Sequence, residues 1–167
     1  MLASLAMAVT VPPRGTRGVP FPRFITRVFS RFVPRMFRRR PNRTSGGIPT
    51  LLLETRGAKS GKPRYAMLGF LEDGPSAWLV MASAIGAKSN PAWLHNLANE
   101  PHATIEFFGG RRVGVDAETL SGAELEAAWR RLETEAPEYP RYLSKTDRHI
   151  AVIRLSQRPT APGHQAG

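Results

Sequence analysis

Residues 48–74, with the sequence IPTLLLETRGAKSGKPRYAMLGFLEDG, decide the fold. Residues 48–55 and 64–71 are short, largely apolar runs of the length of β-strands, and a polar loop containing two glycines joins them. Glu72-Asp-Gly-Pro75 marks a tight turn into a third apolar run, residues 77–83. The stretch therefore predicts three consecutive strands, each antiparallel to its neighbour.

The same pattern of short strands continues toward the C-terminus. Residues 102–108 and 111–119 flank Gly109-Gly110, which is typical of a β-hairpin, and residues 149–155 form a last apolar run. Six short strands with few helical insertions predict an α+β chain, mainly antiparallel β. We expect a closed barrel rather than a doubly wound sheet.

Two short helices are expected between these strands. One begins near Pro91, which suits a first helical turn, and runs through Leu97. The other follows Ser121, whose spacing from Glu124 is that of a capping box. The second helix has one apolar face, formed by Leu125, Ala128, Trp129 and Leu132.

The formal net charge of +11 belongs to the N-terminal quarter of the chain. Residues 1–44 hold ten arginines and no acid, whereas residues 45–167 hold 14 basic and 13 acidic residues. We therefore divide the chain into a basic arm (1–44), a nearly neutral domain (45–157) and a tail (158–167) that we expect to be disordered. A nucleic-acid-binding domain would distribute its cations over the domain, so no nucleic acid is expected as a partner.

The arm carries the pattern of a basic amphipathic N-terminal helix. Arginines recur every four residues on one side of it, at positions 23, 27, 31 and 35. Pro22 suits a first turn, while Pro34 is expected to kink or end the helix. Large apolar residues follow helical spacing on the other side, namely Phe21, Phe24, Ile25, Val28, Phe29, Phe32, Val33, Met36 and Phe37.

Two uses of the arm remain open. Residues 21–40 could lie on an anionic membrane surface, with the apolar face down and the arginines at the headgroups; alternatively, the arm folds onto its own domain. The apolar start, residues 1–11, lacks a positively charged region before it, so we do not expect a secretion signal. The expected location is cytoplasmic, with peripheral attachment to the inner face of the plasma membrane.

The loop Thr55-Arg-Gly-Ala-Lys-Ser-Gly-Lys-Pro-Arg64 carries the clearest chemical signal. Its glycines let backbone N–H groups approach an anion, and Lys59, Lys62 and Arg64 can neutralise phosphate or carboxylate. It is not a P-loop, because Pro63 stands where Ser or Thr should hold magnesium and a strand follows instead of a helix. Seen alone, the loop could equally be a solvated basic hairpin.

A second candidate stretch runs from the end of the third strand into the first helix. Trp93 and Asn96 are three residues apart on that helix and could offer an aromatic plane and an amide to a planar heterocycle. The alternative is a core tryptophan and a capping asparagine. No cysteine is present, and the scattered histidines lack a spaced carboxylate, so no metal site is expected.

Together these stretches resemble the deazaflavin-dependent nitroreductase and quinone reductase family of actinobacteria. The resemblance rests on residues 51–64, on Ala82-Ser83 and on Pro91-Ala-Trp-Leu-His-Asn-Leu97, and residues 99–104 and Thr146-Asp-Arg148 continue it. It implies a split β-barrel like that of FMN-binding proteins. It also implies a hydride transfer from reduced coenzyme F-420, an 8-hydroxy-5-deazaflavin, to a quinone, a nitroaromatic or a similar conjugated acceptor.

The resemblance also implies roles for individual residues. It places the coenzyme's phosphate and acidic tail at Lys59, Ser60, Gly61 and Arg64, its ring system near Ala82, Ser83, Trp93 and Asn96, and the acceptor beneath Tyr139 and Tyr142. Many relatives have two glycines where this chain has Ile85-Gly86, and often a lysine near Ala84, which affects contacts with the coenzyme's tail. An aromatic residue is common where this chain has Ala136, and that departure affects the acceptor pocket more than coenzyme binding. The alternatives are an FMN-binding split-barrel oxidoreductase and a non-catalytic module that binds a membrane surface or nucleic acid.

Overall fold

The computed structural model describes residues 8–20, 30–39, 44–45 and 47–159. Its strands are β1 (Thr44–Ser45), β2 (Ile48–Arg56), β3 (Pro63–Glu72), β4 (Ala77–Met81), β5 (His102–Glu106), β6 (Arg112–Thr119) and β7 (Val152–Gln157). The helices are α2 (Val33–Arg39), the 3-10 helix η1 (Ala84–Gly86), α3 (Ala92–Asn99), α4 (Gly122–Glu135) and α5 (Tyr139–Leu143).

Strands β2 to β7 form a closed antiparallel barrel. The order is β2-β3-β4-β7-β6-β5, and β5 pairs back with β2, with Leu53 opposite Ile105. The predicted barrel is confirmed. The predicted third strand was too long, since β4 ends at Met81 and Ser83 lies in the loop before η1.

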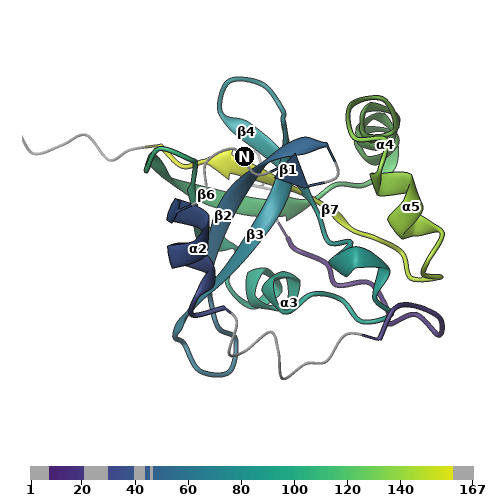
Figure 1. Ribbon diagram of the computed structural model, residues 1–167, viewed down its shortest axis with the longest axis horizontal. Coiled ribbons are helices and arrows are strands. Elements are labelled where there is room, and N and C mark those ends of the chain that lie inside the picture. The colour runs from purple at the N-terminus through teal and green to yellow at the C-terminus, as the bar shows by residue number, and fades with distance from the viewer. Residues whose placement is uncertain (1–7, 21–29, 40–43, 46, 160–167) are drawn as a thin grey trace, which may run out of the picture.

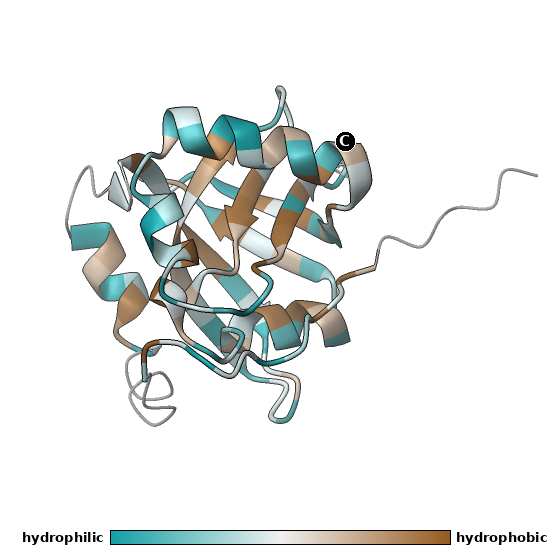
Figure 2. Cartoon of the chain, turned by 90° about the vertical axis from the view of Figure 1, so that its right-hand side faces the viewer, coloured by the Kyte–Doolittle hydropathy of each residue, from teal (hydrophilic) through white to brown (hydrophobic). Residues whose placement is uncertain are grey.

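Side-chain alternation along the strands divides the molecule into an interior and two outer layers. On β2, Leu51 and Leu53 point into the barrel, where Trp93 and Leu97 of α3 pack on them, whereas Leu52 points outward beneath α2. Helices α4 and α5 cover another part of the outer surface (Figure 1). Their hydrophilic residues face away from the strands, which are mostly hydrophobic (Figure 2).

The apolar face predicted for residues 122–132 is confirmed, because Ala128 and Leu132 of α4 are buried against the barrel. The capping box is wrong. Ser121 makes no side-chain bond to the helix, and Glu124 accepts a hydrogen bond from Arg154 Nη1 at 3.0 Å instead. Arg154 also binds Asp73 and Glu118, so a charged cluster across three elements competes with the local cap.

Part of the predicted arm lies along the barrel. Residues 8–19 form an extended strap: Gly15 N–H donates to Lys88 O, and Val19 N–H donates to Gly86 O, both at 2.9 Å. The Asp147 carboxylate accepts hydrogen bonds from the Thr16 hydroxyl and from Arg17 N–H. Two of these anchors, Gly86 and Lys88, belong to the loop that the sequence singled out after β4.

Helix α2 begins at Val33 and has Pro34 in its first turn. A proline in the first turn removes no helical hydrogen bond. The helix that Pro34 was expected to kink or end includes residues 21–29, so this expectation stays a prediction. Val33 and Phe37 pack on Leu52, so these two residues of the apolar stripe face the chain's own barrel. Residues 21–29 of the stripe lie outside the described residues. No helix in the described part of the chain is long and apolar enough to cross a bilayer.

Candidate functional site

The turn between β2 and β3 presents the basic loop at one end of the barrel. Lys59, Ser60, Gly61 and Lys62 are exposed, and Arg64 is half-buried at the start of β3. The Ser60 hydroxyl accepts hydrogen bonds from Lys62 N–H and from Arg64 Nη2, both at 3.3 Å. Gly61 has a φ angle of +64°, a conformation that favours glycine, so the shape of the turn accounts for a glycine at this position.

Most backbone N–H groups of this loop are used within the chain. Gly57 N–H donates to Lys62 O at 2.9 Å, and Gly61 N–H donates to Gly57 O at 2.7 Å. Ala58 N–H donates to Asn96 Oδ1 at 3.1 Å. Gly57, Ala58 and Gly61 therefore do not form the expected backbone cradle, because the turn itself and Asn96 accept their N–H groups.

The cationic side chains of the loop are available for a ligand. Lys59, Lys62 and Arg64 form no ion pair with any acid in the described ranges. Nearby acids are already engaged: Glu54 pairs with Arg112 at 2.7 Å. A cavity of about 260 Å³ borders the loop and is lined by Glu54, Thr55, Arg56, Gly61, Pro63, His102, Ala103, Thr104 and Arg158.

Asn96 joins the two stretches that the sequence singled out. Its Oδ1 accepts from Ala58 N–H, and its Nδ2 donates to Thr55 Oγ1 at 3.0 Å. Asn96 and Thr55 are 7% and 2% exposed, so this amide has no free face for a ligand. Trp93, also 7% exposed, packs in the barrel core. Asn96 thus supports the loop and Trp93 fills the core, whereas the sequence suggested that both form pocket walls.

The loop after β4 is held by Arg148, which the sequence analysis gave no role. Its guanidinium donates from Nε to Ala87 O at 3.0 Å, from Nη2 to Ser83 O at 2.9 Å and from Nη1 to Asn90 Oδ1 at 2.8 Å. Arg148 is 5% exposed, and burial lowers its pKa. In the sequence, Arg148 was noticed only as part of Thr146-Asp-Arg148, which continues the family resemblance.

Ala82 and Ser83 occupy different environments. Ala82 is fully buried, and its N–H donates to Ala151 O at 2.9 Å, so it offers a ligand neither side chain nor N–H. Ser83 is half-buried at the start of η1, with its carbonyl on Arg148. Only Ser83 of this pair can present a hydroxyl to a bound molecule.

The two tyrosines of α5 stack edge to face, with ring centroids 5.5 Å apart. Tyr139 is 5% exposed and its hydroxyl hydrogen-bonds with Ser45, and burial raises the pKa of this hydroxyl. A Cβ on Gly69 would lie 2.8 Å from the Tyr139 hydroxyl, so β3 needs a glycine there. Tyr142 is half-buried beneath the Lys145 ammonium. Tyr142 is therefore the more accessible of the two.

The structure thus brings the predicted residues together in two groups. The basic loop and α3 form one group through Asn96, and the loop at Ser83 and helix α5 form the other, with α3 between the β2–β3 turn and α5 (Figure 1). The larger surface cavity, about 460 Å³, holds none of these residues. It lies between α2 and the β5–β6 turn over the bidentate pair of Arg38 and Glu106, which are 2.7 and 2.8 Å apart. We place the candidate site at the basic loop, Ser83 and α5, where the predicted binding residues lie, and not in this cavity.

Known proteins share both the sequence pattern and the barrel. A family model described as F-420H(2)-dependent quinone reductase matches residues 26–157. The F-420H(2)-dependent quinone reductase of Mycobacterium tuberculosis is 38% identical over 120 residues, which cover 70% of this chain and 79% of that protein. The structure of an F-420-H(2)-dependent reductase (FDR-A) superposes with a TM-score of 0.58 at 32% identity, over 65% of this chain and 94% of its own.

A more distant likeness concerns the fold alone. HutZ, the heme storage protein of Vibrio cholerae, superposes with a TM-score of 0.52 at 16% identity, over 77% of this chain and 89% of its own. The predicted split barrel and the predicted deazaflavin-dependent family are confirmed, and with the family its coenzyme, F-420. This chain belongs to the F-420H(2)-dependent quinone reductase family.

Proposed function

We propose that this chain passes a hydride from reduced coenzyme F-420 to a quinone, a nitroaromatic or a similar conjugated acceptor, and that the β2–β3 turn holds the coenzyme's anionic part. The observation that carries the proposal is the basic loop itself. Lys59, Lys62 and Arg64 of this loop lack partners among the described acids, and Asn96 fixes the loop to α3. A cluster of unpaired cations on a fixed loop favours a ligand with several negative charges.

The residues present fit this coenzyme in charge and in position. When bound, reduced F-420 supplies a hydride, and a quinone that takes it up together with a proton becomes a hydroquinone. Lys59, Lys62 and Arg64 would bind the anionic tail, with Ser60 orienting Arg64. The Ser83 and Tyr142 hydroxyls are the accessible donors that could stabilise negative charge on the acceptor oxygen.

The test compares Lys59→Ala and Arg64→Ala with Arg130→Ala, which removes an exposed arginine from α4. Each loop variant should weaken F-420 binding by about 1.5–3 kcal/mol, the value of a charged hydrogen bond, while Arg130→Ala binds like the parent. Fluorescence titrations with F-420 and FMN in parallel, followed by turnover with menadione, measure this. Unchanged F-420 affinity in both loop variants, or tighter binding of FMN than of F-420 by the parent, would refute the proposal.

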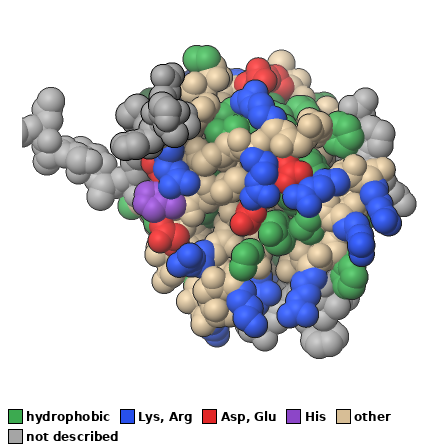
Figure 3. All heavy atoms as spheres, turned by 90° about the vertical axis from the view of Figure 1, so that its left-hand side faces the viewer, with side chains coloured by type: hydrophobic (Ala, Val, Ile, Leu, Met, Phe, Trp, Pro, Cys, Tyr) green, Lys and Arg blue, Asp and Glu red, His purple; other side chains and the backbone are tan. Residues whose placement is uncertain are grey.

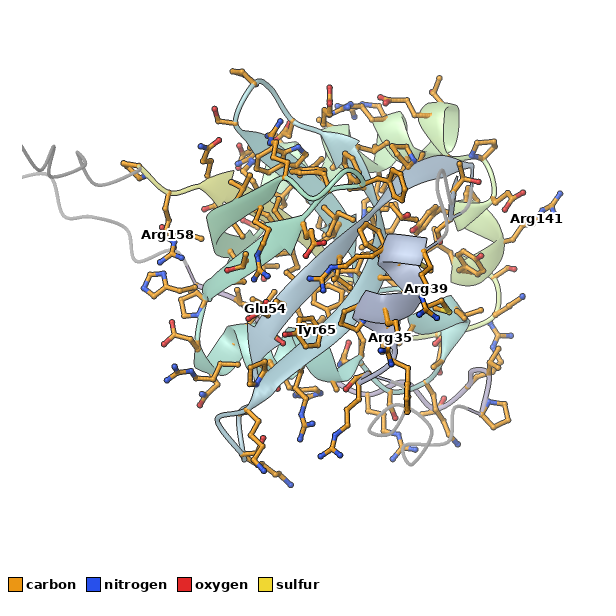
Figure 4. The ribbon with its side chains drawn as sticks, turned by 60° about the vertical axis from the view of Figure 1, so that its left-hand side comes forward. Arg35, Arg39, Glu54, Tyr65, Arg141 and Arg158 are labelled. Atoms are coloured by element: carbon orange, nitrogen blue, oxygen red, sulfur yellow. The ribbon has the colours of Figure 1, made fainter. Side chains whose placement is uncertain are left out.

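We further propose that the α2 side of the molecule binds an anionic membrane surface, from which a lipid-soluble quinone reaches the site. Helix α2 buries Val33 and Phe37 and exposes arginines at positions 35, 38 and 39; Arg31 and Phe32, just before the helix, are also exposed. Lys and Arg predominate over acids on this face (Figure 3). Arg35 and Arg39 project from α2, and Arg141 lies on α5 (Figure 4); the two helices lie on opposite sides of the barrel in Figure 1.

A charge-matched comparison tests the membrane proposal. Arg35→Gln/Arg39→Gln and Arg130→Gln/Arg141→Gln lose the same charge from exposed positions on opposite sides. Each arginine near an anionic surface contributes about 1 kcal/mol, so the α2 pair should bind vesicles about thirtyfold more weakly than the control pair. Flotation with phosphatidylserine-containing vesicles measures this, and equal flotation of the two variants would contradict the proposal. Truncation before Ser45 is a poor test, since it also removes the strap and uncovers Leu52.

A further inference from the structure

The loop between β4 and α3 holds a backbone conformation that its side chains do not favour. Ala84 and Ile85 have φ angles of +45° and +55°, and they are the non-glycine residues with positive φ among those described. For a β-branched residue this left-handed conformation is a genuine outlier, because its Cβ substituents crowd the backbone. Such strain persists only where surrounding contacts impose it, and it is common at ligand-binding sites.

Several contacts impose the conformation of this loop. Within the turn, Gly86 N–H donates to Ser83 O at 2.9 Å and Ala87 N–H to Ala84 O at 3.0 Å. From outside, Arg148 binds the carbonyls of Ser83 and Ala87, and the strap binds that of Gly86. The loop is therefore a fixed structure, held on both sides of Ile85.

Packing does not explain the isoleucine. Its side chain is 52% exposed, so its burial stabilises the fold too little to offset the strain in the backbone. Glycine or asparagine would adopt the same φ angle more easily. Four large hydrophobic residues are exposed in the described part of the chain, and Ile85 is joined by Leu143 at 37%. The other two, Phe32 and Phe108, lie just before α2 and in the β5–β6 turn.

Ile85 and Leu143 lie on adjoining elements beside the accessible hydroxyls. Helix α5 packs so closely on η1 that a Cβ on Gly86 would lie 2.9 Å from Tyr142 O and 2.7 Å from Lys145 Cβ. Ser83 precedes η1 and Tyr142 precedes Leu143. Ile85 and Leu143 are therefore exposed apolar side chains on the elements next to Ser83 and Tyr142, where a hydrocarbon chain attached to a bound acceptor could contact them.

We propose that Ile85, together with Leu143, is a specificity-determining contact for quinones that carry a hydrocarbon side chain. This inference rests on the proposed function and concerns only the choice of acceptor. Apolar contact between the chain and these two residues would favour the substituted quinone over the bare ring, and the bare ring would gain nothing from Ile85.

The experiment compares phylloquinone with menadione, which share a naphthoquinone ring and differ in the hydrocarbon chain, both in the same neutral detergent. The measured quantity is the ratio of kcat/KM for phylloquinone to that for menadione, with the full chain and reduced F-420. Ile85→Gly and Ile85→Asn should lower this ratio about tenfold, and Ile85→Leu by less than about twofold, since only leucine keeps the apolar side chain. The Tm of Ile85→Gly should not fall, because the substitution removes strain. Phe108→Ala, which removes an exposed aromatic residue far from η1 in the sequence, is the control and should keep the parent's ratio.

The outcomes separate the two proposals. A parent that binds F-420 but reduces neither quinone refutes the quinone reductase function itself. A parent that reduces both, with a ratio that Ile85→Gly and Ile85→Asn leave unchanged, refutes only the role of Ile85. A ratio that falls equally in Phe108→Ala would also overturn this inference, since the effect would then belong to exposed apolar residues in general.

Discussion

Replacing Asn96 with alanine should both destabilise the protein and weaken coenzyme binding, although Asn96 itself has no free face for the coenzyme. The substitution removes the hydrogen bonds to Ala58 and Thr55 and leaves the Thr55 hydroxyl, 2% exposed, without its partner. Each net hydrogen bond is worth about 1 kcal/mol, and a buried polar group without a partner costs about 1–3 kcal/mol. We therefore expect a loss of about 2–4 kcal/mol in the free energy of unfolding.

The effect on the coenzyme follows from the position of Ala58 in the basic loop. Without the bond from Ala58 N–H, the loop has to be ordered when the coenzyme binds, and that ordering reduces the affinity. We expect the Kd for F-420 to rise about tenfold, equivalent to about 1.4 kcal/mol. Urea unfolding followed by far-UV circular dichroism gives the stability, and fluorescence titration gives the Kd.

Two further variants make the prediction specific. Asn99→Ala removes an exposed asparagine from the end of the same helix and should change neither quantity. Thr55→Val keeps the shape of Thr55 but removes its hydroxyl, so its effect and that of Asn96→Ala should be less than additive in the double variant, by about 1 kcal/mol. Additive effects would refute the hydrogen bond between these residues. A loss of stability with unchanged F-420 affinity would show that the basic loop is not the coenzyme site.

Three further predictions follow from other contacts. Gly86→Ala should lower the free energy of unfolding by more than about 2 kcal/mol, because the new Cβ would meet Lys145 and Tyr142. Gly74→Ala, at φ +87° with nothing within 4 Å of the new Cβ, should lose only about 1 kcal/mol. Similar losses for the two variants in urea unfolding would contradict the close packing of α5 on η1. Hydrogen bonds from Thr16 and then from Arg17 N–H lower the pKa of Asp147, so the stability they add is present above pH about 4 and is lost as the pH falls through the folded-state pKa. The Tm of Asp147→Asn should therefore be below that of the parent at neutral pH and approach it in acid, and a constant difference would refute this. Tyr142→Phe should lower menadione turnover and retain the affinity for F-420. Tyr139→Phe should chiefly lower the Tm, because the Tyr139 hydroxyl is buried and hydrogen-bonds with Ser45. The reverse pattern would place Tyr139 at the acceptor.

Local sequence patterns were enough to predict the strands, the hairpins and the family of this protein. Strands and hairpins were predictable because alternation and turn residues act between neighbours in the chain, as in Gly109-Gly110 between β5 and β6. The basic loop was also visible, since its cations and glycines lie within ten consecutive residues. Where a local rule failed, as at the Ser121 cap, a distant residue was the cause: Arg154 binds Glu124.

The environments of the candidate site residues, in contrast, depend on contacts between segments that are distant in the chain. Asn96 and Trp93 suggested a pocket wall, but their partners Thr55, Ala58 and the barrel core come from other elements. The strap depends on Asp147, about 130 residues away along the chain, so no pattern in residues 8–19 could reveal it. The exposed, strained Ile85 likewise results from contacts with Arg148 and the strap. Contacts between distant segments set burial and hydrogen-bond partners, and these decide whether a side chain supports a site or faces its ligand.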